Sequence, residues 1–256
     1  MFDKFDKNQI EQMKNKALML SKRLSTMRLL SQAEAERLYE DFSIEFAYDS
    51  NAIEGNAMTL METCVLIKEG VTVIDVPMND QVEIWNHHKF FMNLVTNQVN
   101  KKYLSKSLIL DVHKSLLLST KPEIAGKYRK INVGVGANVN TMYQAPEWSD
   151  VESHMKQYIE KFNEKNKQDI LSFVDAHIDF ERIHPFADGN GRTGRMLLNL
   201  QLIKAGYLPI NIKFADRRDY IQAFKNITRA NDRTFMYGIV LNLEIEALKK
   251  RIEMLK

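Results

Sequence analysis

One short segment concentrates residues that could bind phosphate and move a proton. It reads His184-Pro-Phe-Ala-Asp188-Gly-Asn190-Gly-Arg192-Thr-Gly-Arg195. The glycines beside Asn190 can expose backbone N–H groups, and a helix predicted to begin near Arg192 offers its first amides to an anion. Arg192 and Arg195 are three residues apart and share one helix face. Asp188 supplies an oxygen ligand of the kind Mg²⁺ takes, and His184 suits a general base near neutral pH. The set predicts phosphoryl or nucleotidyl transfer.

This segment resembles the signature of the Fic family, His-x-Phe-x-Asp-Gly-Asn-Gly-Arg-x-x-Arg, at every fixed position. The resemblance implies that His184 deprotonates a Ser, Thr or Tyr hydroxyl of a target protein, which then attacks the α-phosphate of ATP. It assigns the Mg²⁺ ion to Asp188 and the γ-phosphate to Arg195. The same resemblance assigns the α- and β-phosphates to Gly189, Asn190 and Gly191, with Arg192 assisting.

A second motif lies far upstream, at Ser50-Asn-Ala-Ile-Glu54-Gly55. It resembles the inhibitory element of the family, Ser/Thr-x-x-x-Glu-Gly/Asn. Ser50 and Glu54 are four residues apart, so they share a helix face. The resemblance implies that Glu54 pairs with Arg195 and blocks the γ-phosphate. An exposed acid at a helix end is the simpler alternative for Glu54.

Helical patterns dominate the rest of the chain. Capping boxes, in which a Ser or Thr is followed three residues later by Glu, predict helix starts at Ser31, Thr59 and Ser149. Pro185 predicts that a helix ends before His184. The expected helices cover about residues 8–30, 31–53, 59–70, 79–99, 105–118, 149 onward, 168–183, 192–206, 216–230 and 232–256.

The segment 131–144 differs, because its β-branched residues alternate around a Gly-Ala-Asn turn. It predicts a β-hairpin. The family resemblance makes this hairpin a flap over the active site, and an added strand of the target protein would dock at Asn140, Thr141, Met142, Tyr143 and Gln144. Tyr220 and Asn231 lie where the family builds its adenine pocket.

These elements predict an all-α Fic fold, a helical bundle with a β-hairpin flap. We expect an N-terminal helical region with the inhibitory helix at 1–104, a Fic core at 105–210 and C-terminal helices packed on the core at 211–256. His113 and His177 lie among apolar residues and are predicted to be packed core histidines.

Composition limits the classes of partner. Lys and Arg number 36 against 33 Asp and Glu, and these charges are interleaved, which is typical of solvated helix faces and not of a nucleic-acid surface. The single cysteine, the polar N-terminus and the lack of a long apolar run predict a cytoplasmic protein without membrane contact. The expected partners are ATP, Mg²⁺ and a hydroxyl-bearing target protein. A homo-oligomer stays open.

Several alternatives compete with AMP transfer. Gly189-x-Gly191-x-x-Gly194 fits a dinucleotide-binding fingerprint, but the run before it predicts a helix where that motif needs a buried strand. Glu54 could instead position a water, so that the protein removes AMP from modified targets. Some members of the family move phosphate or phosphocholine. A non-catalytic binding module is the alternative from another class, and an intact His184 argues against it.

Overall fold

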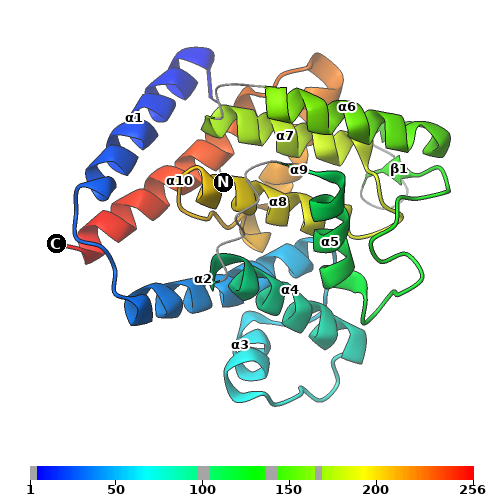
Figure 1. Ribbon diagram of the computed structural model, residues 1–256, viewed down its shortest axis with the longest axis horizontal. Coiled ribbons are helices and arrows are strands. Elements are labelled where there is room, and N and C mark those ends of the chain that lie inside the picture. The colour runs from blue at the N-terminus through cyan, green and yellow to red at the C-terminus, as the bar shows by residue number, and fades with distance from the viewer. Residues whose placement is uncertain (1–4, 97–103, 137–142, 165–168) are drawn as a thin grey trace.

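The computed structural model describes residues 5–96, 104–136, 143–164 and 169–256, and these residues form a helical bundle (Figure 1). The prediction of an all-α fold with a hairpin is confirmed. The helices are α1 (Lys7–Ser25), α2 (Gln32–Ile53), α3 (Leu60–Glu69), α4 (Met78–Thr96), α5 (Lys106–Leu117), α6 (Val151–Glu164), α7 (Ile170–Ile183), α8 (Asn190–Lys204), α9 (Arg217–Ala230) and α10 (Thr234–Met254).

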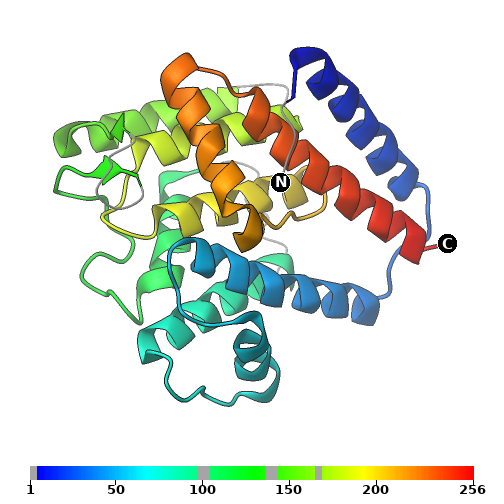
Figure 2. The same ribbon diagram turned by 180° about the vertical axis from the view of Figure 1, so that it is seen from behind.

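Helix α8 lies at the centre of the bundle, and α2, α5 and α7 pack against it. Its side chains from Arg192 to Leu202 are buried on every face. A helix buried on all sides needs no polar stripe, and most residues of α8 after the phosphate motif are apolar. The view from behind shows α9 crossing over this central helix (Figure 2). The motif therefore begins inside the protein, held by its neighbours.

Two of the three predicted capping boxes are present. The hydroxyls of Ser31 and Thr59 accept hydrogen bonds from the amides of Glu34 and Glu62. The third prediction, at Ser149, is wrong. A 3₁₀ turn, Trp148–Asp150, runs directly into α6, so Ser149 lies inside the helical turn instead of capping it.

Helix α1 ends five residues earlier than its apolar pattern predicts. The hydroxyls of Ser25 and Thr26 donate to the carbonyls of Lys22 and Arg23, at 2.7 and 2.8 Å. These side chains satisfy carbonyls that the next helical turn would otherwise bond. The chain then leaves α1 and enters α2 at Ser31.

The segment 208–213, which precedes a short 3₁₀ helix, is not helical and joins no sheet among the described residues. Its backbone is satisfied by side chains: Asn199 bonds both the amide and the carbonyl of Ile210, and Asp49 accepts from the amide of Phe214 and the side chain of Asn211. The dinucleotide alternative has no structural basis here, because α7, and not a strand, precedes Gly189.

The predicted hairpin is present, with short strands β1 (Gly134–Val135) and β2 (Tyr143–Gln144). The strands are antiparallel, with Gly134 opposite Gln144 and Val135 opposite Tyr143. They form the only sheet in the part of the chain that the structure describes. The predicted docking residues Asn140, Thr141 and Met142 lie outside the described residues.

The first and last helices of the chain lie side by side, because α1 packs along α10 (Figures 1 and 2). One apolar core contains Ile10, Phe180 and Leu241, one from each of the three predicted regions. The boundaries at 104 and 210 remain a prediction. None of the described helices has the length and apolar character that crossing a membrane requires.

Candidate active site

The loop between α7 and α8 is braced by the side chain of Asn190. Its Oδ1 accepts from the amide of Phe186 at 2.9 Å, and its Nδ2 donates to the carbonyl of Phe186 at 2.8 Å. The Phe186 ring stacks on His113, with 3.7 Å between centroids. Gly189 has φ of +75°, a conformation that favours glycine, and an added Cβ would lie 2.6 Å from Leu117. Asn190 therefore shapes the loop with its side chain and can offer a phosphate only its backbone amide.

His113 fixes the other side of this loop. Its Nδ1 accepts from the amide of Gly126 at 2.8 Å, so its Nε2 carries the proton and donates to the carbonyl of Asp188 at 2.9 Å. Burial lowers the pKa of His113 to about 4, which keeps the ring neutral. The structure therefore places His113 as a packed core histidine, as the sequence predicts.

His184 caps the C-terminus of α7 in the left-handed conformation, with φ of +50° and ψ of +60°. Its Nδ1 lies 3.1 Å from the carbonyl of Glu181 and donates to it, which leaves Nε2 as the proton-accepting nitrogen. Burial lowers the pKa of His184 below its ordinary value, although the Glu181 carbonyl and the charge of Glu54 act in the opposite direction. Arg129 fixes the backbone here by donating to the carbonyl of His184 at 2.8 Å. The ring is held neutral at pH 7, in the form that a base requires.

The N-terminus of α8 forms the floor beside this histidine. Within the described residues no side chain caps this helix. The carboxylate of Glu54 lies directly over it, because a Cβ added to Gly191 would stand 2.1 Å from Glu54 Oε1. The absence of a side chain at Gly191 thus leaves room for one negatively charged group above the positive end of the helix dipole.

Arg195 connects this floor to the end of α2. Its Nη2 lies 2.8 Å from Glu54 Oε1 and donates at 2.8 Å to the carbonyl of Ser50, and its Nε donates to the Ser50 hydroxyl at 3.0 Å. The Arg195 side chain is 3% exposed, whereas that of Glu54 is 39% exposed. The motifs at 50–55 and 184–195, which are more than a hundred residues apart, therefore meet in one site.

Asp188 and Arg192 lie in a separate network of charges. Arg192 bonds Glu83 of α4, and its Nη2 lies 3.5 Å from Asp188 Oδ1. Lys121, which follows α5, contacts Asp188 Oδ2 and stands 3.6 Å from Glu83. Burial by itself would raise the pKa of Asp188, but Lys121, Arg192 and the adjacent amide of Gly189 outweigh it and hold the pKa below its ordinary value. Asp188 is therefore ionised, as a metal ligand must be.

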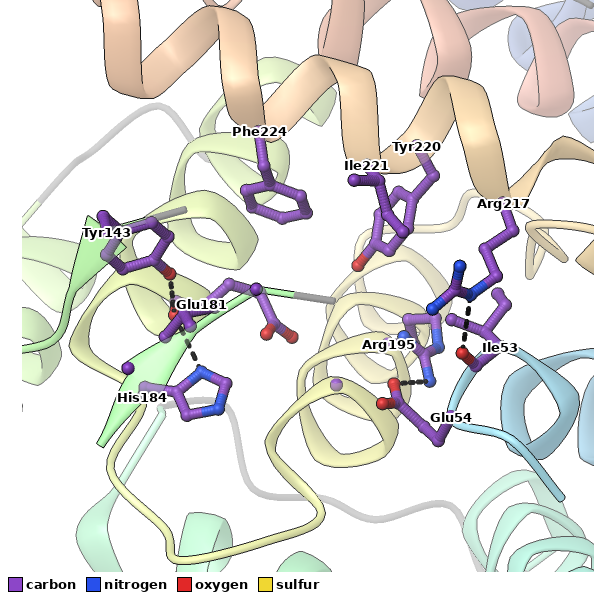
Figure 3. A pocket seen from close by; sticks show the side chains of 14 residues that line it. Ile53, Glu54, Tyr143, Glu181, His184, Arg195, Arg217, Tyr220, Ile221 and Phe224 are labelled. Carbon is purple, nitrogen blue, oxygen red and sulfur yellow. Dashed lines mark hydrogen bonds and ion pairs between the residues drawn. The ribbon is translucent and has the colours of Figure 1, made fainter. Parts of the chain in front are cut away.

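A pocket of about 210 Å³ opens between these elements (Figure 3). His184 and Tyr143 stand on one side of it, and Glu54 and Arg195 on the other. The pocket is lined by Ile53, Glu54, Gly134, Val135, Gly136, Tyr143, Glu181, His184, Gly191, Arg195, Arg217, Tyr220, Ile221 and Phe224. The polar end of this pocket is formed by the two motifs, and α9 supplies apolar and aromatic side chains above them.

The flap is tied to the pocket by Tyr143, whose hydroxyl donates to the carbonyl of Glu181 at 2.6 Å. The same carbonyl accepts from His184. The carboxyl group of Glu181 is buried next to Gly194, and burial raises its pKa to about 8 against the opposing effect of Arg195. Glu181 is therefore a neutral acid at pH 7 on the wall of the pocket.

Of the two residues predicted for an adenine pocket, only Tyr220 lines the pocket described above. Its hydroxyl is 2.8 Å from His177 Nε2, and its ring lies 5.9 Å from the Arg195 guanidinium carbon. Asn231 caps the far end of α9, with φ of +51°, and does not line the pocket. Eleven helical positions separate it from Tyr220, roughly 16 Å along the axis. Spacing in the sequence did not reveal which end of α9 faces the site.

Four residues in or near the site lie outside the two sequence motifs. Glu83 lies in the expected helix at 79–99 and Lys121 follows the one at 105–118, but no motif marks either residue, and only the fold brings them to Asp188. Arg217 donates to the carbonyl of Ile53 at 2.8 Å and so holds the end of α2. Glu181 could have been found, because it is three residues before His184 and shares the last turn of α7.

Comparison with known proteins identifies a family. Residues 103–202 match the model of the Fic/DOC family. The chain is 32% identical over 211 residues to the protein adenylyltransferase Fic of Nematostella vectensis, covering 78% of this chain and 47% of that protein. It is 28% identical over 235 residues to the protein of the same name from Aedes aegypti, covering 90% of this chain and 45% of that protein. The chain thus spans about half the length of these relatives.

Solved structures share the fold over nearly the whole chain. Residues 134–508 of Fic-1 from C. elegans superpose with a TM-score of 0.81 at 22% identity, covering 95% of this chain and 71% of that one. A Fic domain containing signaling protein from Bacteroides thetaiotaomicron gives 0.80 at 23% identity, covering 95% of both chains. Residues 103–202, at the centre of this shared fold, therefore form a domain of the Fic/DOC family.

Proposed function

We propose that this chain transfers AMP from ATP to a Ser, Thr or Tyr hydroxyl of a target protein. Relatives from Nematostella vectensis and Aedes aegypti are named protein adenylyltransferases. In the proposed reaction His184 Nε2 takes the hydroxyl proton, and the hydroxyl oxygen forms a bond to the α-phosphorus. The bond from that phosphorus to the bridging oxygen of the β-phosphate breaks, and pyrophosphate leaves.

One observation carries the proposal: a neutral His184 faces the same pocket as an anion site that already holds a carboxylate. The Glu54 carboxylate rests over Gly191 and on Arg195, where three features favour negative charge. These are the helix dipole, the first amides of α8 and a buried guanidinium. A phosphate chain entering the pocket would meet the same groups, with the base within the same space. This arrangement suits attack at a phosphorus atom.

The proposal assigns each phosphate to groups near these contacts. The backbone amides of Gly189, Asn190 and Gly191 would bind the α- and β-phosphates, because the Asn190 side chain is engaged with Phe186. Arg195 would bind the γ-phosphate once Glu54 moves aside. Arg192 would neutralise charge from the side of Asp188, where it already lies. Preorganised donors of this kind stabilise charge that develops in the transition state.

Mg²⁺ is part of the proposal, and Asp188 is the residue that would hold it. The carboxylate is 45% exposed and ionised, so an ion can reach it. No cluster of three His, Cys, Asp or Glu side chains capable of holding a metal occurs in the described ranges. That fits Mg²⁺, which commonly takes one or two carboxylates and completes its shell with phosphate and water. When bound, the ion would neutralise phosphate charge.

The remaining parts of the substrate have surfaces of matching chemistry. Tyr220, Ile221 and Phe224 give the pocket an apolar wall on which a nucleoside would rest. The exposed edge of β2 at Gln144 would receive a target segment as an added strand. Proline at position 144 should then impair transfer to the target more than it impairs ATP binding. Equal losses in both would argue against docking at this edge.

The experiment that tests the proposed function measures inhibition by Glu54 and catalysis by His184 together. Purified wild type, Glu54→Gly, and Glu54→Gly combined with His184→Ala are incubated with α-labelled ATP, Mg²⁺ and a cell extract. We expect Glu54→Gly to label protein at least about a hundredfold faster than wild type, because alignment for in-line attack accounts for a large share of such a rate. The double variant should not label protein. Equal labelling by wild type and Glu54→Gly would refute the inhibitory role of Glu54.

A second function on the same site is the removal of AMP from a modified target. The observation that favours it is that Glu54 and His184 line one pocket, so Glu54 could orient a water toward the phosphorus. To test this, target protein that Glu54→Gly has labelled with AMP is incubated with the wild-type protein. Release of label by wild type but not by Glu54→Gly would support removal, and stable label with both would exclude it.

A further inference from the structure

Asp188, the proposed Mg²⁺ ligand, is already in contact with a cation. The ammonium group of Lys121 bonds its Oδ2 atom. Lys121 is not part of either motif. It lies just after α5, where its own amide donates to the carbonyl of Leu117 at 2.8 Å and fixes the backbone. The position from which a metal ion would reach Asp188 is thus shared with a lysine of the same chain.

Glu83 provides a second position for the same ammonium group. Its Oε1 atom stands 3.6 Å from Lys121 Nζ, and its Oε2 atom bonds Arg192. The four side chains form a closed ring, because Lys121 and Arg192 each lie against both acids. Two positive and two negative charges balance in this ring. An added divalent ion at Asp188 would repel the ammonium group of Lys121, so the two cations compete for the same carboxylate.

The geometry of the ring determines which cation would withdraw. The Arg192 side chain is 4% exposed and fixed by Glu83, whereas that of Lys121 is 36% exposed. A lysine has a flexible stem and a point charge, so it can move between two carboxylates without losing a fixed geometry. Glu83 is only 11% exposed and stays in place to receive it.

We propose that Lys121 is a positioning residue that occupies the cation position of Asp188 and moves to Glu83 when a divalent ion binds. The inference rests on the Mg²⁺ site of the proposed function and adds a competition within the chain. Lys121 holds the Asp188 carboxylate in place before the ion arrives. It also lowers the affinity for the ion, since part of the binding energy is used to displace the ammonium group.

The test measures binding of Mn²⁺, used as a paramagnetic substitute for Mg²⁺, by the free-ion signal in electron paramagnetic resonance. The full chain is titrated without nucleotide and again with ADP. Lys121→Met removes the charge and keeps the length, Lys121→Arg keeps the charge, and Asp188→Asn removes the ligand. Lys68→Met is the matched control, because Lys68 pairs with Asp41 on the exposed surface. Thermal melts establish that each variant is folded.

Lys121→Met should bind Mn²⁺ about tenfold more tightly than wild type, as expected for removal of one nearby positive charge in a partly solvated site. Lys121→Arg keeps the charge and should bind no more tightly than wild type, Lys68→Met should bind like wild type, and Asp188→Asn should bind more weakly. Damage to the fold would weaken binding, so tighter binding cannot arise from it. Unchanged or weaker binding by Lys121→Met, with Asp188→Asn impaired, would overturn this inference alone. Unchanged binding by Asp188→Asn would overturn it together with the proposed Mg²⁺ ligand.

Discussion

Replacing Glu54 by Ala should destabilise the protein and at the same time improve its binding of ATP. The change leaves the Arg195 guanidinium buried without its carboxylate partner, although its hydrogen bonds to Ser50 remain. Breaking a fully buried ion pair costs roughly 3–5 kcal/mol, and an exposed pair contributes about 0–1 kcal/mol. Arg195 is 3% exposed but Glu54 is 39% exposed, so the cost lies between these limits. We expect a loss of about 2 kcal/mol, which lowers Tm by roughly 4–8 °C in a chain of this size.

The same 2 kcal/mol should reappear in the affinity for the γ-phosphate. In wild type ATP must displace Glu54 from Arg195 before its γ-phosphate can bind, and about 2 kcal/mol corresponds to roughly a 30-fold weaker affinity. ADP lacks the γ-phosphate and should bind both proteins alike. The ratio of ADP to ATP dissociation constants should therefore be about 30-fold greater in Glu54→Ala than in wild type.

The assay is thermal unfolding with and without each nucleotide in the presence of Mg²⁺. At a concentration 100 times its dissociation constant, ATP should stabilise Glu54→Ala by about 2.7 kcal/mol and so restore the lost stability. Glu45→Ala is the matched control, because Glu45 lies on the same helix and pairs with Lys213 at the exposed surface. It should change Tm very little. An equal preference for ATP over ADP in wild type and Glu54→Ala would refute the competition for Arg195.

Three further predictions concern the loop, the floor and a buried acid. Asn190→Ala leaves the amide and carbonyl of Phe186 unpaired and should cost about 2–4 kcal/mol in urea unfolding; a loss below about 0.5 kcal/mol would contradict the bracing role. Gly191→Ala should destabilise the protein, because the added methyl group clashes with Glu54. The double variant with Glu54→Ala should be at least about 1 kcal/mol more stable than the sum of the two single effects predicts, and strict additivity would contradict the contact. Burial raises the pKa of Glu244 to about 8 from an ordinary value of 4.5. The protonated carboxyl group therefore makes its full contribution to folding stability below about pH 4.5, and this contribution is lost as the pH rises to about 8. Glu244→Gln should reduce that loss between pH 5 and pH 8 in urea unfolding, and an unchanged pH profile would argue against it.

Much of the fold could be predicted, because its signals are local. The capping boxes at Ser31 and Thr59, the glycine at position 70 and Pro185 each act within one helical turn, and the helices begin or end there. Ser149 shows the limit of such signals. The same Ser-x-x-Glu spacing lies inside a helical turn when the preceding residues form a 3₁₀ turn, and nothing in the spacing distinguishes the two cases.

The candidate site was only partly predictable for the same reason. The motif around Asn190 contains its own turn and helix start, so its local geometry follows from the residues themselves. Glu83 and Lys121 reach Asp188 from separate segments, and their contact depends on how α4 and α5 pack. The position of Asn231 at the far end of α9 likewise follows from the direction of that helix, which periodicity does not give.

The central claim is that the AMP part of ATP, and not its terminal phosphate, is transferred with the help of His184. In the direct measurement, Glu54→Gly and the target proteins are incubated in parallel reactions with ATP labelled at the α- or the γ-phosphate, and the release of pyrophosphate is followed. The proposed mechanism predicts that only the α-label becomes protein-bound, with one pyrophosphate released for each label, and that adding His184→Ala abolishes both. Protein-bound γ-label, or α-label transfer that survives His184→Ala, would contradict it.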